Sequence, residues 1–245
     1  MKKIKSIVWE NLKTVFFALI IAILIRSLIV QPFYIPSSSM EPNLLVGDRI
    51  FVTKYTYGYS KHSFPFSPGI SNKRVMYTEP KQGDLVVFKT PADNRTDYIK
   101  RLIGMPGDEV QFINGEIFIN GEKIKRKRIN KEINIRCGNF ILDVDVYEET
   151  LPNQTKYIAV YSSKGTLKNS DKYLVPENHF FLMGDNRDCS KDSRFLTSVG
   201  YVHKDNLVGK AQFIFFSSDR TFGSIFYFWK WNKSIRFDRF FKKII

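Results

Sequence analysis

The sequence predicts a mostly β protein that is preceded by one N-terminal transmembrane helix. Residues 12–30 are apolar almost throughout, which is the composition of a membrane span. From residue 33 onward, short apolar or alternating runs are separated by turn residues, which is the pattern of β-strands. No run in this later part has the spacing of an amphipathic helix. Together these observations favour a β body behind a single span.

Composition limits the possible chemistry. A chain of 245 residues allows one large domain or two small ones, and its net charge of +14 is compatible with a nucleic-acid partner, an anionic membrane surface or neither. Two cysteines, Cys137 and Cys189, exclude a four-cysteine zinc site, and a single disulfide between them stays open. Since His62, His179 and His203 have no metal-ligand spacing, we expect them to be structural or solvated, with no metal site.

The apolar segment 12–30 is about 28 Å long as a helix, which just spans a bilayer. Arg26 lies about one turn from its end, where the side chain can reach the interface. Three lysines precede the span and Lys13 lies at its start, while no lysine or arginine follows it until Arg49, so residues 1–11 are expected in the cytoplasm and the rest outside. A removable signal peptide is the alternative, but no small-x-small cleavage site follows.

Later segments predict individual strands. Residues 84–90 predict a short buried strand, residues 98–104 an alternating strand, and residues 206–216 a final strand. Asn-Gly pairs at 114–115 and 120–121 predict two hairpins. The basic run 122–136 is expected to be the solvated face of a strand pair rather than a nucleic-acid patch, because no nucleic-acid motif accompanies it. The basic, aromatic tail 221–245 suits either a membrane interface or ordinary packing.

Two short stretches could carry chemistry. Residues 36–48, PSSSMEPNLLVGD, follow the apolar segment with hardly a charge, although such a stretch is also typical of a turn. On the alternating strand, Lys100 shares a face with Tyr98 and Leu102. Burial there would lower the lysine pKa, and a drop of about two to three units makes the amine a working general base. The alternative for Lys100 is a lysine that reaches solvent from a sheet edge.

Four segments, in this order, resemble the sequence boxes of bacterial type I signal peptidase: IPSSSMEPNLLVGD, QGDLVVFKTP, DYIKRLIGMPGD and MGDNRDCSKDSRF. The resemblance covers most of the chain apart from roughly 54–80 and 122–172. It implies a folded antiparallel β-sheet as the catalytic core, at 31–111 and 174–220, with a smaller β subdomain inserted at 112–173. It also implies a serine endopeptidase that needs no cofactor.

Carried over residue by residue, the resemblance implies that Ser39 is the nucleophile and Lys100 the general base. Ser37 would join the Ser39 backbone N–H in the oxyanion hole, and Ser190 would orient the lysine amine. Gly184 and Asp185 would open the loop that carries Ser190. The remaining implied residues are the structural ion pair Asp192 and Arg194, the S1 pocket residues Ile35, Met40, Leu44 and Ile99, and the S3-side residues Phe33 and Val87.

The chain departs from the family at three places. Asn43 stands where threonine is usual, which leaves its local hydrogen bond open, and Cys189 replaces a common asparagine. The connection FLTSVGYVHKDN is a few residues longer than usual. A thiol nucleophile at Cys189 paired with His179 is a disfavoured alternative.

The resemblance therefore predicts a single-pass protein of the inner membrane, with its catalytic domain on the periplasmic face. It would act as a monomer on signal-peptide-bearing preproteins beside the lipid bilayer, without a nucleic-acid partner. A self-cleaving Ser/Lys repressor is one rival, but it would need a DNA-binding module where this chain has a span. A membrane-anchored, non-catalytic β scaffold is the other.

Overall fold

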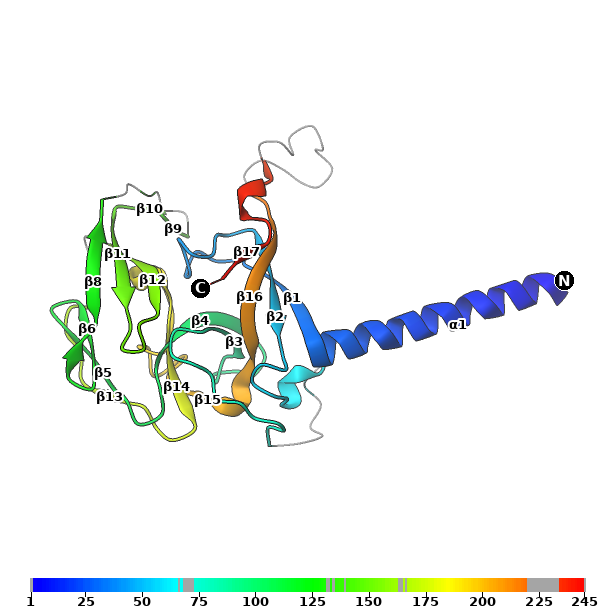
Figure 1. The fold of residues 1–245 in the computed structure, drawn as a ribbon, viewed down its shortest axis with the longest axis horizontal. Coiled ribbons are helices and arrows are strands. Elements are labelled where there is room, and N and C mark those ends of the chain that lie inside the picture. The colour runs from blue at the N-terminus through cyan, green and yellow to red at the C-terminus, as the bar shows by residue number, and fades with distance from the viewer. Residues whose placement is uncertain are drawn as a thin grey trace.

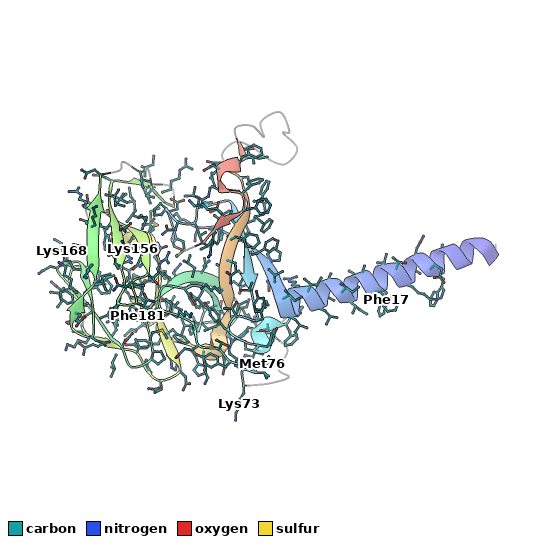
Figure 2. The ribbon with its side chains drawn as sticks, in the orientation of Figure 1. Phe17, Lys73, Met76, Lys156, Lys168 and Phe181 are labelled. Atoms are coloured by element: carbon teal, nitrogen blue, oxygen red, sulfur yellow. A yellow bond between two sulfur atoms is a disulfide. The ribbon has the colours of Figure 1, made fainter. Side chains whose placement is uncertain are left out.

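The computed structural model describes residues 2–65, 67, 73–130, 133, 135–138, 140–162, 165, 167–219 and 234–244. Its first element is α1 (Lys2–Leu24), which continues into one π-helical turn, η1 (Ile25–Ile29). The segment Val8–Ile29 is long and apolar enough to cross a membrane. Figure 1 shows this helix projecting away from the β body, and in Figure 2 side chains such as Phe17 extend from it with no other element beside them. Because Phe17 is 59% exposed, the protein itself does not cover this apolar surface.

A large antiparallel sheet forms the centre of the β body. Its strand order is β1-β2-β16-β3-β4-β14-β15, and β17 also pairs with β16. The bounds are β1 (Val30–Tyr34), β2 (Asp48–Thr53), β3 (Leu85–Lys89), β4 (Asp97–Gly104), β14 (His179–Met183), β15 (Val202–His203), β16 (Leu207–Ser217) and β17 (Lys242–Lys243). The prediction that 206–216 is the final strand is wrong, because β17 pairs with β16 at Phe213 and Ile214.

Three smaller sheets lie between β4 and β14 in sequence and to one side of the large sheet in space (Figure 1). The first contains β5 (Glu109–Ile113), β6 (Glu116–Ile119), β7 (Glu122–Lys123) and β13 (Tyr173–Leu174). The second contains β8 (Lys125–Ile129), β11 (Val144–Thr150) and β12 (Lys156–Ser162), and the third pairs β9 (Ile135–Cys137) with β10 (Phe140–Leu142).

Two hairpins of the first small sheet confirm the sequence prediction. Asn114 and Gly115 join β5 to β6, and Asn120 and Gly121 join β6 to β7. All four residues have positive φ, between 52° and 80°, which asparagine and glycine adopt most readily. The basic strand β8 that follows has exposed lysines at 125 and 127, as expected for a solvated face.

Alternation within the strands explains how the sheets pack. Along β3, Leu85 and Val87 join one apolar cluster while Val86 and Phe88 join another on the opposite face, so the strand is buried on both sides. A third cluster unites the large sheet with the small ones, since Phe181 packs with Ile117 and its neighbours. The small sheets are therefore fixed to the large one by a shared core.

Short 3₁₀ turns are the helical elements described after η1: η2 (Lys61–Ser63), η3 (Arg187–Cys189), η4 (Lys204–Asn206) and η7 (Phe237–Arg239). Within the C-terminal tail, Arg239 is buried and pairs with Asp48, whose Oδ2 lies 2.6 Å from the guanidinium. Phe240 packs against Phe216. The described part of the tail, 234–244, thus packs on the β body, while residues 221–233 of the predicted tail lie outside the described residues.

Candidate active site

Strand β4 positions Lys100. Successive side chains of a strand point to opposite faces, and Lys100 lies on the same face as Tyr98 and Leu102. Leu102 is fully buried and Lys100 is only 4% exposed. The amine lies 5.5 Å from the centre of the Tyr98 ring. Lys100 therefore does not reach solvent from a sheet edge, as the alternative interpretation required.

Ser39 lies opposite this lysine, in the loop between β1 and β2. Its Oγ is 2.6 Å from Lys100 Nζ, and the same amine donates to the backbone oxygen of Ile99 at 3.0 Å. Ser37 Oγ is 3.4 Å from Ser39 Oγ. A serine hydroxyl, a buried amine and a second hydroxyl therefore meet at one point, although 61 residues separate the serine from the lysine.

Burial lowers the pKa of Lys100 into the range in which an amine can act as a base. The pKa of Lys100 is lowered to about 8 from its ordinary 10.5, mainly because burial removes the amine from water. The charges of Asp192 and Asp185 oppose this shift, and the charge of Arg194 adds to it. With a pKa near 8, roughly a quarter of the molecules carry a neutral amine at pH 7.5, compared with about one in a thousand for an unperturbed lysine. The amine can therefore accept a proton from Ser39 near neutral pH.

Residues 184–194, hereafter the 184–194 loop, contact the segment that contains Ser39. Asn186 donates from its backbone N to Ser39 O at 3.1 Å and from its side chain to Ser38 O at 3.2 Å. Gly184 lies so close that a Cβ would come within 2.5 Å of Ser39 O and 2.2 Å of Ser190 Oγ. No larger residue fits there unless the loop moves.

Ser190, Asp192 and Arg194 lie farther along this loop. Arg194 pairs with Asp192 through two contacts of 2.8 Å. Burial alone would raise the pKa of Asp192, but this guanidinium and a hydrogen bond from Gly184 N lower it. Among the described residues, Ser190 Oγ is buried and has no hydrogen-bond partner of ordinary geometry, although it is close enough to Asp192 to contribute to lowering that pKa. Within the described part of the chain, Lys100 therefore forms no hydrogen bond with Ser190, the residue expected to orient its amine.

Sequence reasoning missed two buried ion pairs that hold the 184–194 loop. Asp185 forms a two-pronged pair with Arg101 of β4, both contacts at 2.8 Å and both side chains fully buried. Arg187 pairs with Glu149 of β11 at 2.6 Å. Arg101 lies on the apolar face of β4 beside Ile99, and a charge at such a position could have signalled a buried partner. Glu149 gave no such signal.

The tyrosines of β12 complete the environment of Glu149. Tyr157 donates a hydrogen bond of 2.7 Å to one carboxylate oxygen, and Tyr161 donates to the other. Arg187 also reaches both tyrosine hydroxyls, at 2.9 Å and 2.6 Å. Every polar group of this buried set is thereby satisfied by the others, which is the condition for burying charges at tolerable cost.

Asn43, which stands where threonine is usual in the segment IPSSSMEPNLLVGD, forms hydrogen bonds within this network. Its Nδ2 donates to Asp185 Oδ2 and to Ile158 O, each at 2.7 Å. The amide therefore connects the Ser39 segment to both the 184–194 loop and β12.

A pocket of about 420 Å³, hereafter the serine pocket, opens beside Ser39 and Lys100. Four of the six residues expected to bind substrate line it: Phe33, Ile35, Val87 and Ile99. The other two, Met40 and Leu44, are fully buried in the apolar cluster that contains Ile35 and Val87. The pocket therefore has an apolar wall supported from behind by a close-packed core.

Cys189 also lines the serine pocket, and it forms a disulfide with Cys137 of β9. The sequence left this pairing open, and the structure shows that the chain closes a 52-residue loop with it. Because both sulfurs are bonded, Cys189 offers no thiolate, which removes the alternative of a thiol nucleophile with His179. His179 instead packs edge to face with His203, at 4.9 Å between ring centres.

Sequence comparisons with known proteins point to one family. Residues 8–216 match the family model described as "Signal peptidase, peptidase S26". The chain is 41% identical to the signal peptidase I of Rickettsia typhi (strain ATCC VR-144 / Wilmington), over 93% of this chain and 90% of that protein. It is 40% identical to the signal peptidase I of Rickettsia canadensis (strain McKiel), over 96% and 93%. A crystal structure of a signal peptidase I from Enterococcus faecalis V583 matches at 24% identity and a TM-score of 0.32, over 54% of this chain and 97% of its own.

Proposed function

Because this chain belongs to the signal peptidase family, peptidase S26, we propose that it is a membrane-anchored serine endopeptidase that removes N-terminal signal peptides from exported preproteins. The observation that carries the proposed mechanism is the 2.6 Å contact between Ser39 Oγ and the buried Lys100 Nζ. It joins a nucleophile to a base whose pKa burial lowers to about 8.

The proposed reaction follows from this geometry. Lys100 accepts the Ser39 proton as Oγ attacks the scissile carbonyl, and the Ser39 N–H together with the Ser37 hydroxyl stabilises the oxygen that becomes negative. Lys100 then gives its proton to the departing amine, and the acyl-enzyme forms. Water, deprotonated by the same lysine, then attacks the acyl carbonyl, and the bond between that carbon and Ser39 Oγ breaks as Lys100 returns the proton to Oγ. The signal peptide leaves with a free carboxylate, and Ser39 is regenerated. The hydrogen bond to Ile99 O keeps the amine aimed at Ser39, and we assign Ser190, with its unpaired hydroxyl, as a second positioning group.

Substrate preference follows from the serine pocket. Ile35, Ile99, Phe33 and Val87 give it an apolar wall, and we assign Ile35 and Ile99 to the P1 side chain and Phe33 and Val87 to the P3 side chain. Small side chains at P1 and P3 fit such a wall, whereas large ones would have to displace the close-packed cluster behind it. Preproteins with alanine at both positions are therefore the expected substrates.

Membrane topology completes the proposal. The segment Val8–Ile29 would anchor the protein, with its lysine-rich N-terminus in the cytoplasm and the β body on the periplasmic face. There Ser39 would meet a cleavage site as it emerges from the bilayer. Sharing a membrane raises the effective concentration of enzyme and substrate.

The decisive experiment incubates the detergent-solubilised full-length protein with a preprotein carrying Ala-x-Ala at its cleavage site. We expect Ser39→Ala to abolish cleavage, and Ser37→Ala to reduce kcat by about 10²–10³ because one oxyanion donor is lost. The matched control is the neighbouring Ser38→Ala, which should retain cleavage within a few-fold. Cleavage that survives Ser39→Ala would refute the nucleophile assignment.

A second variant separates the peptidase from an anchored, non-catalytic scaffold. Lys100→Arg keeps the positive charge but cannot give up its proton. The peptidase should lose cleavage of the preprotein, whereas a scaffold would show no cleavage in either form.

A further inference from the structure

A second pocket, hereafter the basic pocket, opens where the N-terminal helix meets the β body. Its volume is about 620 Å³, within the range of small-molecule sites. Three basic residues from separate segments line it: Arg26 from η1, Lys61 from η2 and Arg95 from the turn between β3 and β4. Chain segments this far apart in sequence share the pocket only because the fold brings them together.

Charge in the basic pocket is unbalanced. The fourth basic residue, Lys89, is neutralised by Asp97 at 2.9 Å. The other acidic residue, Asp93, accepts hydrogen bonds within its own turn from Arg95 N and Thr96. Among the described residues, no ion pair within 4.0 Å involves the three basic residues Arg26, Lys61 and Arg95. An anion entering the pocket would therefore meet unpaired cations.

Two buried groups nearby respond to this excess of positive charge. Burial, together with the charges of Arg26 and Lys89 and against the opposing charge of Asp97, lowers the pKa of Lys54 to about 8. Burial likewise lowers the pKa of His62 to about 4, and Lys61 adds to the effect. His62 lines the pocket and is 4% exposed, and its Nε2 has no hydrogen-bond partner among the described residues. A buried ring nitrogen without a partner at the pocket wall can form a hydrogen bond with a polar ligand.

The position of the basic pocket relative to the membrane indicates which anion it would bind. Arg26 lies within the last turn of the apolar segment Val8–Ile29, so the basic pocket lies at the level where a bilayer's hydrocarbon ends and lipid phosphates begin. Phe33 and Phe64 also line it, which gives the pocket apolar surface for the start of a lipid's acyl chains. Basic side chains combined with apolar surface at this level suit a lipid headgroup better than a soluble anion.

We propose that the basic pocket binds the headgroup phosphate of an anionic membrane lipid, through Arg26, Lys61 and Arg95. This site is distinct from Ser39 and Lys100, and lipid binding can be measured whether or not the chain cleaves preproteins. Phe33 and Asp97 line both the basic pocket and the serine pocket. A bound lipid would therefore lie directly beside the substrate.

The test uses the full-length protein in a non-ionic detergent, with bound phosphatidylglycerol counted by native mass spectrometry over a range of lipid concentrations. The site variant is Arg26→Gln/Lys61→Gln/Arg95→Gln. Its matched control, Lys125→Gln/Lys127→Gln/Lys242→Gln, removes the same three charges from exposed lysines elsewhere. We expect one tightly retained lipid in the wild type and the control, and affinity about a hundredfold lower in the site variant.

Several results would overturn the proposal. One is equal lipid retention by the site variant, and another is an equal loss in the control. Equal binding of phosphatidylcholine would contradict the preference for a net negative lipid. Displacement of phosphatidylglycerol by millimolar inorganic phosphate would make the pocket a free-phosphate site. If the triple variant fails to fold, Arg95→Glu alone provides the same test, because Arg95 lies on an exposed turn and the reversed charge should repel the phosphate.

Discussion

Strand β4 and the 184–194 loop supply the two sides of the candidate active site, and they are held in place by different means. Lys100 belongs to a regular strand whose neighbours on both sides, β3 and β14, fix it by ladder hydrogen bonds. The 184–194 loop is instead held by buried ion pairs whose partners lie 38 and 84 residues away in sequence. The comparison shows that the position of the proposed general base depends on local alternation, whereas the loop behind the proposed nucleophile depends on long-range charges.

The small sheets provide partners that hold the 184–194 loop. Glu149 of β11 binds Arg187, Val160 N of β12 donates to Asp185 O at 2.9 Å, and Cys137 of β9 is bonded to Cys189. Each contact ends on the 184–194 loop. We therefore interpret the inserted strands as the support that holds this loop against Ser39.

The largest expected effect is the loss of cleavage activity when Lys100 of β4 is replaced. Lys100→Met should reduce preprotein cleavage at least about a thousandfold, because Ser39 loses its general base. The same change should stabilise the fold at pH 7 by about 1–3 kcal/mol, because a buried ammonium is replaced by an apolar side chain. Cleavage assays and denaturant unfolding at pH 7 measure the two effects.

The pH dependence of unfolding is the control for that stabilisation. The folded-state pKa of Lys100 is about 8, below its ordinary 10.5, so the unfolded chain binds more protons between these values. The wild type should therefore gain stability as pH rises from about 8 to 10.5, and Lys100→Met should lack this gain. Parallel stability curves for the two proteins would contradict a desolvated lysine.

Next in size is the loop's ionic support. Glu149→Ala leaves Arg187 buried without its carboxylate, and we expect a loss of about 3–5 kcal/mol in unfolding free energy. Glu148→Ala is the matched control, because its partner Lys156 lies 3.7 Å away on a partly exposed surface, and it should change stability by about 0.5 kcal/mol or less. Similar losses in both variants would show that Glu149 is not a special support.

The disulfide comes third. Cys137→Ser/Cys189→Ser should lose about 2–4 kcal/mol of stability, since the bond closes a 52-residue loop in the unfolded chain. Because Cys189 lines the serine pocket, KM for the preprotein should rise as well. Dithiothreitol should reproduce both effects in the wild type and do nothing to the double variant. An unchanged KM would show that the disulfide does not shape the serine pocket.

The smallest effect is the pH dependence of the wild-type enzyme. Only the neutral Lys100 amine can accept the Ser39 proton, so kcat/KM should fall about tenfold for each pH unit below the pKa of about 8 and level off above it. Steady-state cleavage between pH 6 and 10 measures this curve. A flat profile across pH 7–9 would contradict Lys100 as the base.

Local pattern was sufficient for the span, for the strands at 84–90 and 98–104 and for both Asn-Gly hairpins, because each depends on residues close together in sequence. The same alternation placed Lys100 between apolar neighbours, and the ordered boxes singled out Ser39. The additional strand β17 was missed, because two lysines carry no strand signal until β16 offers them an edge.

Sequence by itself therefore determined the family and the pair of groups proposed to react, since strand period and motif order are properties of the chain. Tertiary structure alone decided that Asp185 meets Arg101, that Glu149 meets Arg187, that the two cysteines bond and that three basic residues share a pocket. The physical reason is that the energy of a buried charge depends on which partner the fold brings to it, and sequence spacing does not specify that partner.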